Sequence, residues 1–247
     1  MNENVFSVIP MRTWRWLGVN EIKTAAAVEE QSIEIPADQT QKLVDIINED
    51  RSIAKRIKIT VGERARVEFT GVDISRADSA VELTIELLGD DSSADISSVY
   101  FGSDERKINL NYVIRQCGRR TDAVMNVRGA LTDHSEKNFR GTLDFQRGSK
   151  GSVGRESEEV VLLSKDVRNR SVPLMLSHED DVDGHHAVSI GRIDEAKLFY
   201  IMSRGLDREQ AERLIVEAAF NPVLERIDDE QLRAELADNI QRRLSDV

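Results

Sequence analysis

Several features are scarce in this chain of 247 residues, and each scarcity excludes a class of protein. There is a single cysteine, Cys117, so no internal disulfide can form, which fits a reducing cytosol. No hydrophobic run approaches the ~20 residues needed to cross a bilayer, and the N-terminus shows no secretory leader. A formal net charge of −11 leaves no basic excess for nucleic acid. The sequence therefore predicts a soluble, cytoplasmic protein that binds neither membrane nor nucleic acid.

The chain does contain a series of short segments with alternating hydrophobic and polar residues, between about residues 30 and 170. Such alternation is typical of strands, and most segments end at residues that favour turns. The main helical pattern among them is 40–50, in which Leu43, Val44, Ile46 and Ile47 fit a helix. Short strands with few helices predict a sandwich, a barrel or a β-solenoid, and no repeat of fixed length chooses among these. The expected strands are 57–61, 67–69, 81–87, 108–113 and 142–145.

After residue 193 the hydrophobic period changes to that of helices. Asp194 is expected to cap a helix that stops at Gly205, and Asp207 to cap a second, which Pro222 breaks or kinks. Asp228 is expected to begin a third helix with an apolar strip. We therefore expect three parts: an N-terminal arm (1–29), a β-rich core domain (30–193) and a small helical domain (194–247).

Both tryptophans, Trp14 and Trp16, lie within the arm. Aromatic side chains bury a large area, so the pattern favours an extended arm whose indoles pack on the body. An aromatic platform for a nucleobase would need more positive charge than the two neighbouring arginines provide.

Three of the four histidines, His178, His185 and His186, stand beside the acidic segment 179–183. Imidazole serves both as a metal ligand and as a proton carrier near neutral pH. The acidic segment lacks the spacing of a calcium-binding loop and is more typical of a solvated turn. A metal-dependent enzyme that uses the three histidines is one hypothesis. Adjacent residues of a strand face opposite sides, however, so His185 and His186 do not easily serve one metal.

Two further places have residues that suit chemistry. Glu158 and Glu159 would offer hard oxygen ligands, although such a pair more often marks a solvated turn before a buried strand, here Val160–Leu163. Cys117 lies among three arginines, whose charge would lower the pKa of its thiol. A reactive thiol and a half-buried structural cysteine are both possible, and the second is favoured.

Residues 171–227 contain a series of short motifs, which are Asp181-Val182, His186, Gly191-Arg192-Ile193-Asp194, Leu198-Phe199-Tyr200, Ser203-Arg204-Gly205 and Phe220-Asn221-Pro222-Val223. Over this range the chain resembles the SufB/SufD family of iron–sulfur cluster assembly proteins. Weaker similarity covers 129–133, 139–141 and 162–164, and the arm at 10–20 resembles the family's N-terminal entry.

The resemblance implies a right-handed parallel β-helix (a β-solenoid) followed by a small α-helical domain, and a non-enzymatic role. A compact, SufD-like subunit would pair through its β-helix, either with a SufB-like paralogue or with itself as a dimer. It would dock SufC, an ABC-type ATPase, on its C-terminal helices. The isolated chain would hold no stable cofactor, and iron or an iron–sulfur cluster would be present only transiently at a subunit interface.

The chain departs from the family at its thiol positions. Glu159 stands where the SufB type has an essential cysteine, Gly184 stands where the SufD type often has one, and Cys117 matches neither. The resemblance therefore predicts His186 as the metal ligand at the interface, with Glu159 and Cys117 as further candidates for the interface site.

The first C-terminal helix holds the candidates for ATPase docking, because aromatic, Met and Arg residues are enriched at interfaces. The alternative is that most of them pack the helices onto the β body. A purely structural β-solenoid adaptor, with no metal, is a third hypothesis besides the assembly subunit and the metal enzyme. The docking candidates are Leu198, Phe199, Tyr200, Met202 and Arg204.

Overall fold

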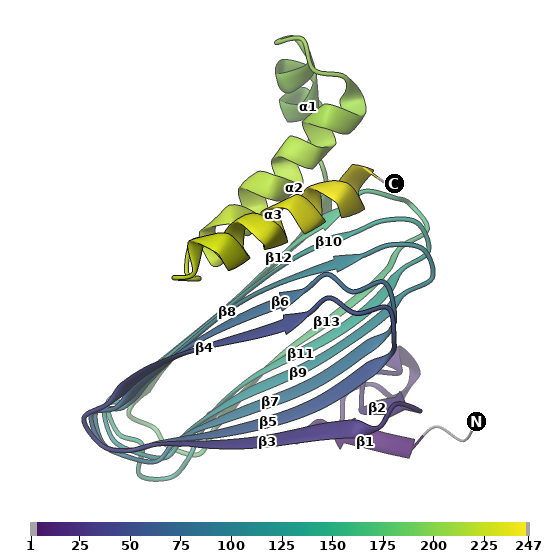
Figure 1. Cartoon of the computed structure of the whole chain (residues 1–247). Helices are drawn as coiled ribbons and strands as arrows, with labels where there is room; N and C mark the ends of the chain where they lie inside the picture. Colours follow the sequence, from purple (N-terminus) through teal and green to yellow (C-terminus); the bar gives the residue numbers. More distant parts are fainter. Residues whose placement is uncertain (1–3, 246–247) are drawn as a thin grey trace.

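The computed structural model describes residues 4–245 and shows a parallel β-solenoid with helices at its C-terminal end (Figure 1). Within this range twelve strands form two six-stranded sheets in which all neighbours run parallel. The mainly β, solenoid fold with C-terminal helices is thus confirmed. The first sheet contains β3 (Val28–Ile35), β5 (Ile53–Val61), β7 (Ser79–Leu87), β9 (Lys107–Gln116), β11 (Glu136–Phe145) and β13 (Arg168–Ser177). The second contains β4 (Thr40–Ile47), β6 (Arg66–Asp73), β8 (Ser93–Gly102), β10 (Asp122–Leu131), β12 (Ser152–Leu162) and β14 (Val182–Arg192).

Each turn of the solenoid adds one strand to both sheets, but the turns differ in length. Along one column, Ile57 pairs with Leu83, Leu83 with Tyr112, Tyr112 with Gly141 and Gly141 with Pro173. These pairings correspond to spacings of 26, 29, 29 and 32 residues. The changing length explains why no fixed repeat is visible in the sequence.

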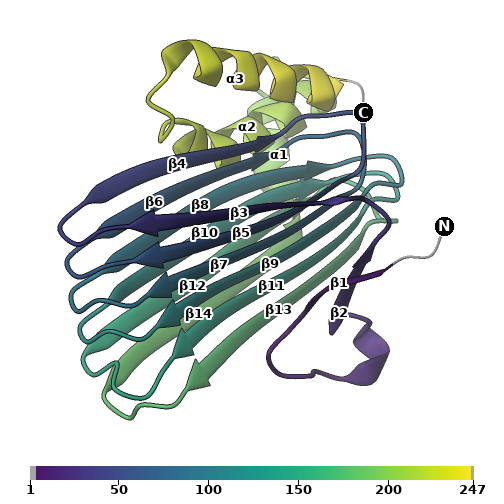
Figure 2. The same ribbon diagram turned by 60° about the horizontal axis from the view of Figure 1, so that its bottom comes forward.

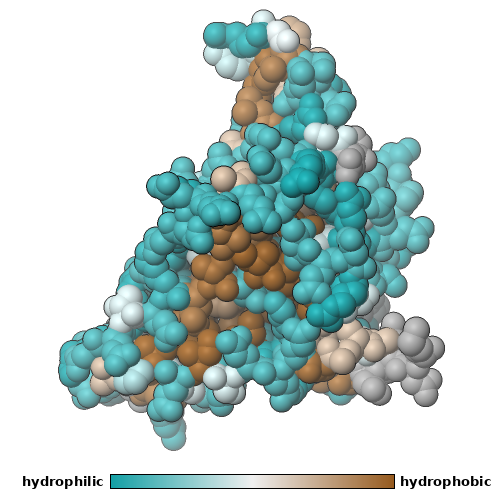
Figure 3. Space-filling view, in the orientation of Figure 1, coloured by the Kyte–Doolittle hydropathy of each residue, from teal (hydrophilic) through white to brown (hydrophobic). Residues whose placement is uncertain are grey.

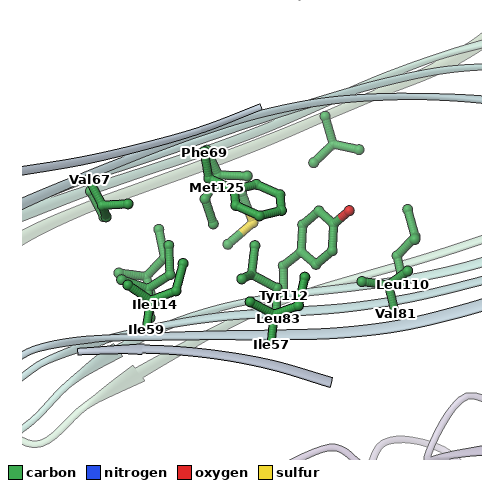
Figure 4. Close-up of a cluster of buried hydrophobic side chains, with 14 of the residues drawn as sticks. Ile57, Ile59, Val67, Phe69, Val81, Leu83, Leu110, Tyr112, Ile114 and Met125 are labelled. Carbon is green, nitrogen blue, oxygen red and sulfur yellow. The ribbon is translucent and has the colours of Figure 1, made fainter. Parts of the chain in front are cut away.

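The interior of the solenoid is a continuous apolar core between the two sheets. Its members come from the inward positions of successive strands (Figure 4). Apolar side chains of successive strands lie over one another, because parallel pairing in register aligns residues of the same face on neighbouring strands. Figure 3, in the orientation of Figure 1, shows hydrophobic side chains in the middle of the face on the side of β3 and β4. The half-buried Ile33 and Leu43 come from these first two strands.

The helix predicted over 40–50 is wrong, because this segment forms strand β4. Ile47 is buried in the interior core, whereas Ile46 packs against the outer cluster beneath the helices. A strand that is apolar on both faces has no clear alternation, and its hydrophobic residues then resemble a helical pattern.

Three helices follow the solenoid: α1 (Glu195–Met202), α2 (Arg208–Leu224) and α3 (Glu230–Ser245). Asp194 caps α1 and Asp207 caps α2, as predicted, whereas α2 continues past Pro222 to its end. The third cap is Asp229, whose side chain accepts the N–H groups of two residues in the first turn of α3, and Asp228 pairs with Lys42 instead. None of the helices within residues 4–245 is long and apolar enough to cross a membrane.

Helices α2 and α3 cover the outer face of the second sheet (Figure 1). Outward residues of β6, β8 and β10, such as Val99 and Phe101, form one apolar cluster with them. Arg243 of α3 is buried there and donates to the Ser75 carbonyl (3.1 Å) and to Ser103 Oγ (3.0 Å). These contacts fix the helical hairpin to the solenoid.

The N-terminal arm contains β1 (Asn4–Val8), the short 3-10 helix η1 (Arg15–Leu17) and β2 (Glu21–Thr24). The two strands pack on the outer face of the first sheet through Phe6 and Ile22. The prediction that the tryptophans pack on the body is wrong, because Trp14 is 66% and Trp16 80% exposed. The arm is held by Phe6 and Ile22, and the exposed indoles take no part in this packing.

Candidate functional site

The last turn of the solenoid presents an open end. Within residues 4–245, β13 pairs only with β11 and β14 only with β12, so both strands have a free edge. His186 of β14 lies beside Glu156 of β12 in register, and Glu156 is an inward, buried residue. His186 therefore shares the inward face, where no further turn covers it, and it is exposed. An imidazole at the mouth of the solenoid is accessible to anything that closes this end.

Directly beneath His186, the carboxyl group of Glu156 is buried without a partner. The residue is 3% exposed, and neither Oε1 nor Oε2 accepts a hydrogen bond. It reaches across the interior to Gly141 of β11, where a Cβ atom would overlap Oε1. Burial, followed by the charge of Glu158, raises the pKa of Glu156 to about 8. A carboxyl group that is largely protonated near neutral pH therefore lies one strand below the imidazole.

Glu158, two residues further along β12, forms a buried ion pair with Lys137 of β11. Lys137 Nζ also donates to Ser171 Oγ of β13 (2.9 Å), and the Tyr100 hydroxyl donates to Glu158 Oε1 (3.1 Å). Burial lowers the pKa of Lys137 to about 8, although Glu158 opposes this shift. Burial and the same carboxylate raise the pKa of Tyr100 well above its usual value.

Together these residues add polar groups to the interior of the last two turns, where Phe139, Leu143 and Phe145 otherwise continue the apolar core. The column that holds His186 and Glu156 continues inward as Met125, Ile96 and Phe69. Chemically, the open end offers one imidazole, one unpaired carboxyl group and a paired lysine. Imidazole nitrogen and carboxylate oxygen both bind iron, and the raised pKa of Glu156 lets its carboxyl group carry a proton near neutral pH.

Glu159, the candidate at the cysteine position, is not part of this group. It lies on the outer face of β12, where its carboxylate is exposed and 3.5 Å from Arg128 Nε. The residues that lie near His186 are its neighbours Glu156 and Glu158. The expectation of a solvated turn for Glu158 and Glu159 is also wrong, since both lie within β12.

Cys117 lies just after β9, two strands away from the open edge at β13. It is half-buried, and its N–H donates to the Leu87 carbonyl (2.9 Å). Burial raises the pKa of its thiol, with a further contribution from Glu86 that outweighs the charge of Arg115. The prediction of a lowered pKa is therefore wrong, and the environment matches the half-buried structural cysteine that the sequence favoured.

The other two predicted histidines do not join His186. His185 points to the outer face, where its Nε2 lies 2.9 Å from Asp183 Oδ1, and His178 follows the end of β13. In the part of the chain that the structure describes, no three His, Cys, Asp or Glu side chains are grouped so that they could hold a metal ion. The strand geometry thus separates the histidines, as the alternation of side chains required.

Four of the five candidates for ATPase docking lie on α1, on two of its faces, and Arg204 follows the end of this helix. Leu198 is fully buried, whereas Phe199 is 73% and Tyr200 60% exposed. Arg204 is exposed, lies over the Tyr200 ring at 5.0 Å and donates to its hydroxyl (2.8 Å). Met202 is half-buried. Leu198 therefore packs the helix, and the aromatic pair with Arg204 forms the presented face, on a helix that stands away from the solenoid (Figure 1).

Sequence reasoning missed Glu156 and Lys137. A signal was present in the alternation of β12, where Gly154, Glu156, Glu158 and Val160 occupy the inward positions. Acidic residues in the apolar register of a strand are unusual, because burying a charge without a partner is costly. Their proximity to His186 depends on pairing between strands 30 residues apart and was not visible locally.

The family model described as "SUF system FeS cluster assembly, SufBD core domain" matches residues 23–219. The chain belongs to this family. It is 29% identical to the iron–sulfur cluster assembly protein SufD of Bacillus subtilis over 183 residues, which is 74% of this chain and 42% of that protein. It is 28% identical to a SufBD family protein of Pyrococcus horikoshii over 167 residues, 68% of this chain and 37% of that protein. The chain thus spans less than half the length of these relatives.

Proposed function

We propose that this chain is a non-catalytic subunit of an iron–sulfur cluster assembly scaffold that acts as a pair joined at the open end of the solenoid. Family membership supports a role in iron–sulfur cluster assembly. The observation that carries the proposal is the position of His186, exposed and inward-facing at the free end above a buried, unpaired carboxyl group.

The free edge suits pairing with a second solenoid. Val188 and Ile190, inward residues of β14, are exposed although large and apolar. An uncovered edge strand readily pairs with another chain, and closing the end would remove these side chains from water. His186 lies close to the middle of β14. Antiparallel pairing about a two-fold axis through the middle of β14 brings the two imidazoles to the interface between the two solenoids. There they would bind the nascent cluster, which is the substrate of the scaffold.

Replacing His186 by Ala is expected to abolish cluster formation without weakening the fold, since the side chain is exposed. His185→Ala is the matched control, because it removes the same imidazole one residue away on the outer face. Both variants are purified after co-expression with the partner proteins of the source cell, and iron and acid-labile sulfide per protomer are measured. Equal loss in both variants, or none in either, contradicts the role of His186. In the second case the chain is a structural adaptor.

We also propose that α1 docks an ABC-type ATPase through Phe199, Tyr200 and Arg204. Supporting this, the helix stands off the body and presents two aromatic side chains, and aromatic and Arg residues dominate binding energy at interfaces. Helices α2 and α3, fixed to the solenoid by Arg243 and the outer apolar cluster, would transmit movement of the ATPase to the interface between the two solenoids.

Phe199→Asp is expected to weaken ATPase binding by at least about 30-fold, the loss of one hot-spot residue. The control is Val44→Asp, which places the same charge on an exposed apolar residue of β4. Binding of each variant to the co-purified ATPase is measured by calorimetry. Similar affinities for the two variants would show that α1 is not the docking helix.

A further inference from the structure

The loop at the tip of the arm, residues 10–20 (the tryptophan loop), exposes an aromatic pair that neither the fold nor the proposed site uses. Trp14 and Trp16 stack on each other with ring centroids 6.4 Å apart, and the neighbouring Met11 is also exposed. Large aromatic residues left in water usually mark a contact surface. Tryptophan and arginine are the residue types most enriched in binding hot spots, and arginines flank both indoles.

The same loop carries positive charge that is not neutralised. Arg12 and Arg15, with Lys23 of β2, line a hollow at its base, where Glu21 is the acidic neighbour. Within residues 4–245 these three cations have no ion-pair partner. Elsewhere many basic residues pair closely, as Arg64 does with Asp38 and Arg120 with Asp91. In a chain with a net charge of −11, a surplus of cations at one place points to an acidic partner.

The loop is already ordered for binding. Its ends are joined by the bond from the Ile9 N–H to the Asn20 carbonyl (3.1 Å). The Asn20 side chain accepts the Thr13 N–H (2.7 Å), and Gly18 turns the chain with φ of +66°. A preformed loop loses little conformational entropy when it binds.

The arm crosses the turns of the solenoid and carries this loop to the open end. Arg56 of β5 donates to the Phe6 carbonyl (2.8 Å), Asn111 of β9 to Ser7 Oγ (2.8 Å) and Arg140 of β11 to the Val19 carbonyl (3.5 Å). The tryptophan loop therefore continues beyond β11 and lies beside β13, the last strand of the first sheet, as Figure 2 shows. The base of the arm packs on Ala54 and Ala80, near the beginnings of β5 and β7. The arm thus covers the half of the sheet where the strands begin.

The acidic turn, residues 178–181, lies at the opposite end of β13, where this strand stops at Ser177. It contains Glu179, Asp180 and Asp181, and Asp183 follows at the start of β14. The Gly148 N–H donates to Glu179 Oε2 (3.0 Å), and this bond keeps the pKa of Glu179 below its usual value. The acidic turn and the tryptophan loop therefore both lie at the open end of the solenoid. They lie at opposite ends of strand β13.

Two copies related by a two-fold axis can pair these edges in two ways. With the axis perpendicular to the sheets, β13 pairs with the β13 of the second copy and β14 with its β14, both antiparallel. The beginning of each strand then meets the end of its partner. With the axis along the strands, β13 pairs with β14, and the two acidic turns stack on each other. Like charges in close contact are unfavourable, so the first arrangement is preferred.

We propose that, in the pair of solenoids, the tryptophan loop of one copy clasps the acidic turn of the second copy. The inference rests on the proposed pairing and adds to it a contact outside the strands, with a defined orientation. Arg12 and Arg15 meet Asp180 and Asp181 of the other protomer, and the indoles cover the adjoining backbone. Because the contact is isologous, it occurs twice in each pair.

A charge swap tests this contact in the full chain. The arm variant Arg12→Glu/Arg15→Glu and the turn variant Asp180→Lys/Asp181→Lys should each raise the dimer Kd by at least about 10-fold at low salt. Combining all four substitutions should restore it. Analytical ultracentrifugation measures Kd, and Arg233→Glu/Arg242→Glu on α3 controls for the change in net charge. If the variant with all four substitutions dimerises no better than the arm variant or the turn variant alone, the proposed contact is wrong.

Intrinsic fluorescence gives a second readout, because both tryptophans of the chain lie in this loop. Val188→Lys/Ile190→Lys places charges on the inner edge of β14 and should give a monomer. Its indoles should be quenched by acrylamide more strongly than those of the wild-type dimer, and equal quenching overturns the clasp. If the wild type is a dimer and the Val188→Lys/Ile190→Lys variant is still a dimer, the proposed pairing edge is wrong. A wild-type chain that stays monomeric contradicts both proposals.

Discussion

Replacing Lys137 by Met is expected to lower the free energy of unfolding by about 3–5 kcal/mol, the cost of removing one partner from a fully buried ion pair. Glu158 would remain buried with the Tyr100 hydroxyl as its donor, and Oε2 is unsatisfied even in the wild type. Met has a similar length, so the loss comes from charge and not from a cavity. Urea denaturation at pH 7 measures the change.

The double variant Lys137→Met/Glu158→Gln should recover most of this loss, because it removes both charges and keeps an acceptor for Tyr100. Arg155→Met serves as a control for an exposed pair, since Arg155 lies on β12 and its partner Asp122 is also exposed. We expect that change to cost less than about 1 kcal/mol. A Lys137 variant as stable as the Arg155 variant would refute the buried-pair assignment, and so would a double variant no better than the single.

Local signals in the sequence located the elements well where one side chain decides the structure. Asp194 and Asp207 begin helices because their carboxylates accept N–H groups of the first turn, a contact within three residues. The alternating segments were predicted correctly as strands because alternation is also a local pattern. Strand β4 was missed because it is apolar on both faces. Choosing the solenoid among all-β folds came from the family resemblance, since turns of 26 to 32 residues hide the repeat.

Of the residues at the candidate site, the sequence analysis predicted His186 and missed Glu156 and Lys137. His186 was identified by its place in a motif, but its neighbours depend on which residue of β12 it pairs with. A shift of one residue would have placed Glu159 inside and Glu156 outside. Burial of the tryptophans was a reasonable expectation from their area and was wrong, because Phe6 and Ile22 already fix the arm. Exposed indoles are a property of a surface, which a single sequence does not reveal.

Glu156 should make the protein less stable as pH rises, and Glu156→Gln should remove this effect. The pKa of Glu156 is raised from 4.5 to about 8 by burial and by Glu158, so the folded chain holds its proton more tightly than the unfolded chain. The resulting stability is fully present below pH ~4.5 and is lost as pH rises toward ~8. The slope approaches ~1.4 kcal/mol per pH unit in this window, for a total of about 5 kcal/mol.

Wild type and Glu156→Gln are therefore expected to differ little near pH 5, whereas at pH 7 the variant should be more stable by about 3 kcal/mol. Taking the difference between the two curves cancels the other titrating groups, including Lys137, whose lowered pKa of about 8 acts mainly at higher pH. Glu159→Gln is the control, because it makes the same substitution three residues further along β12, at an exposed residue of the outer face. Its stability curve should run parallel to that of wild type. Parallel stability curves for Glu156→Gln and wild type would refute the raised pKa of Glu156.

A buried carboxyl group that weakens the fold is retained at functional sites more readily than in ordinary cores. A Glu156→Gln protein that is more stable and yet assembles fewer clusters would therefore join Glu156 to His186 in one site, whereas full assembly would confine its effect to stability.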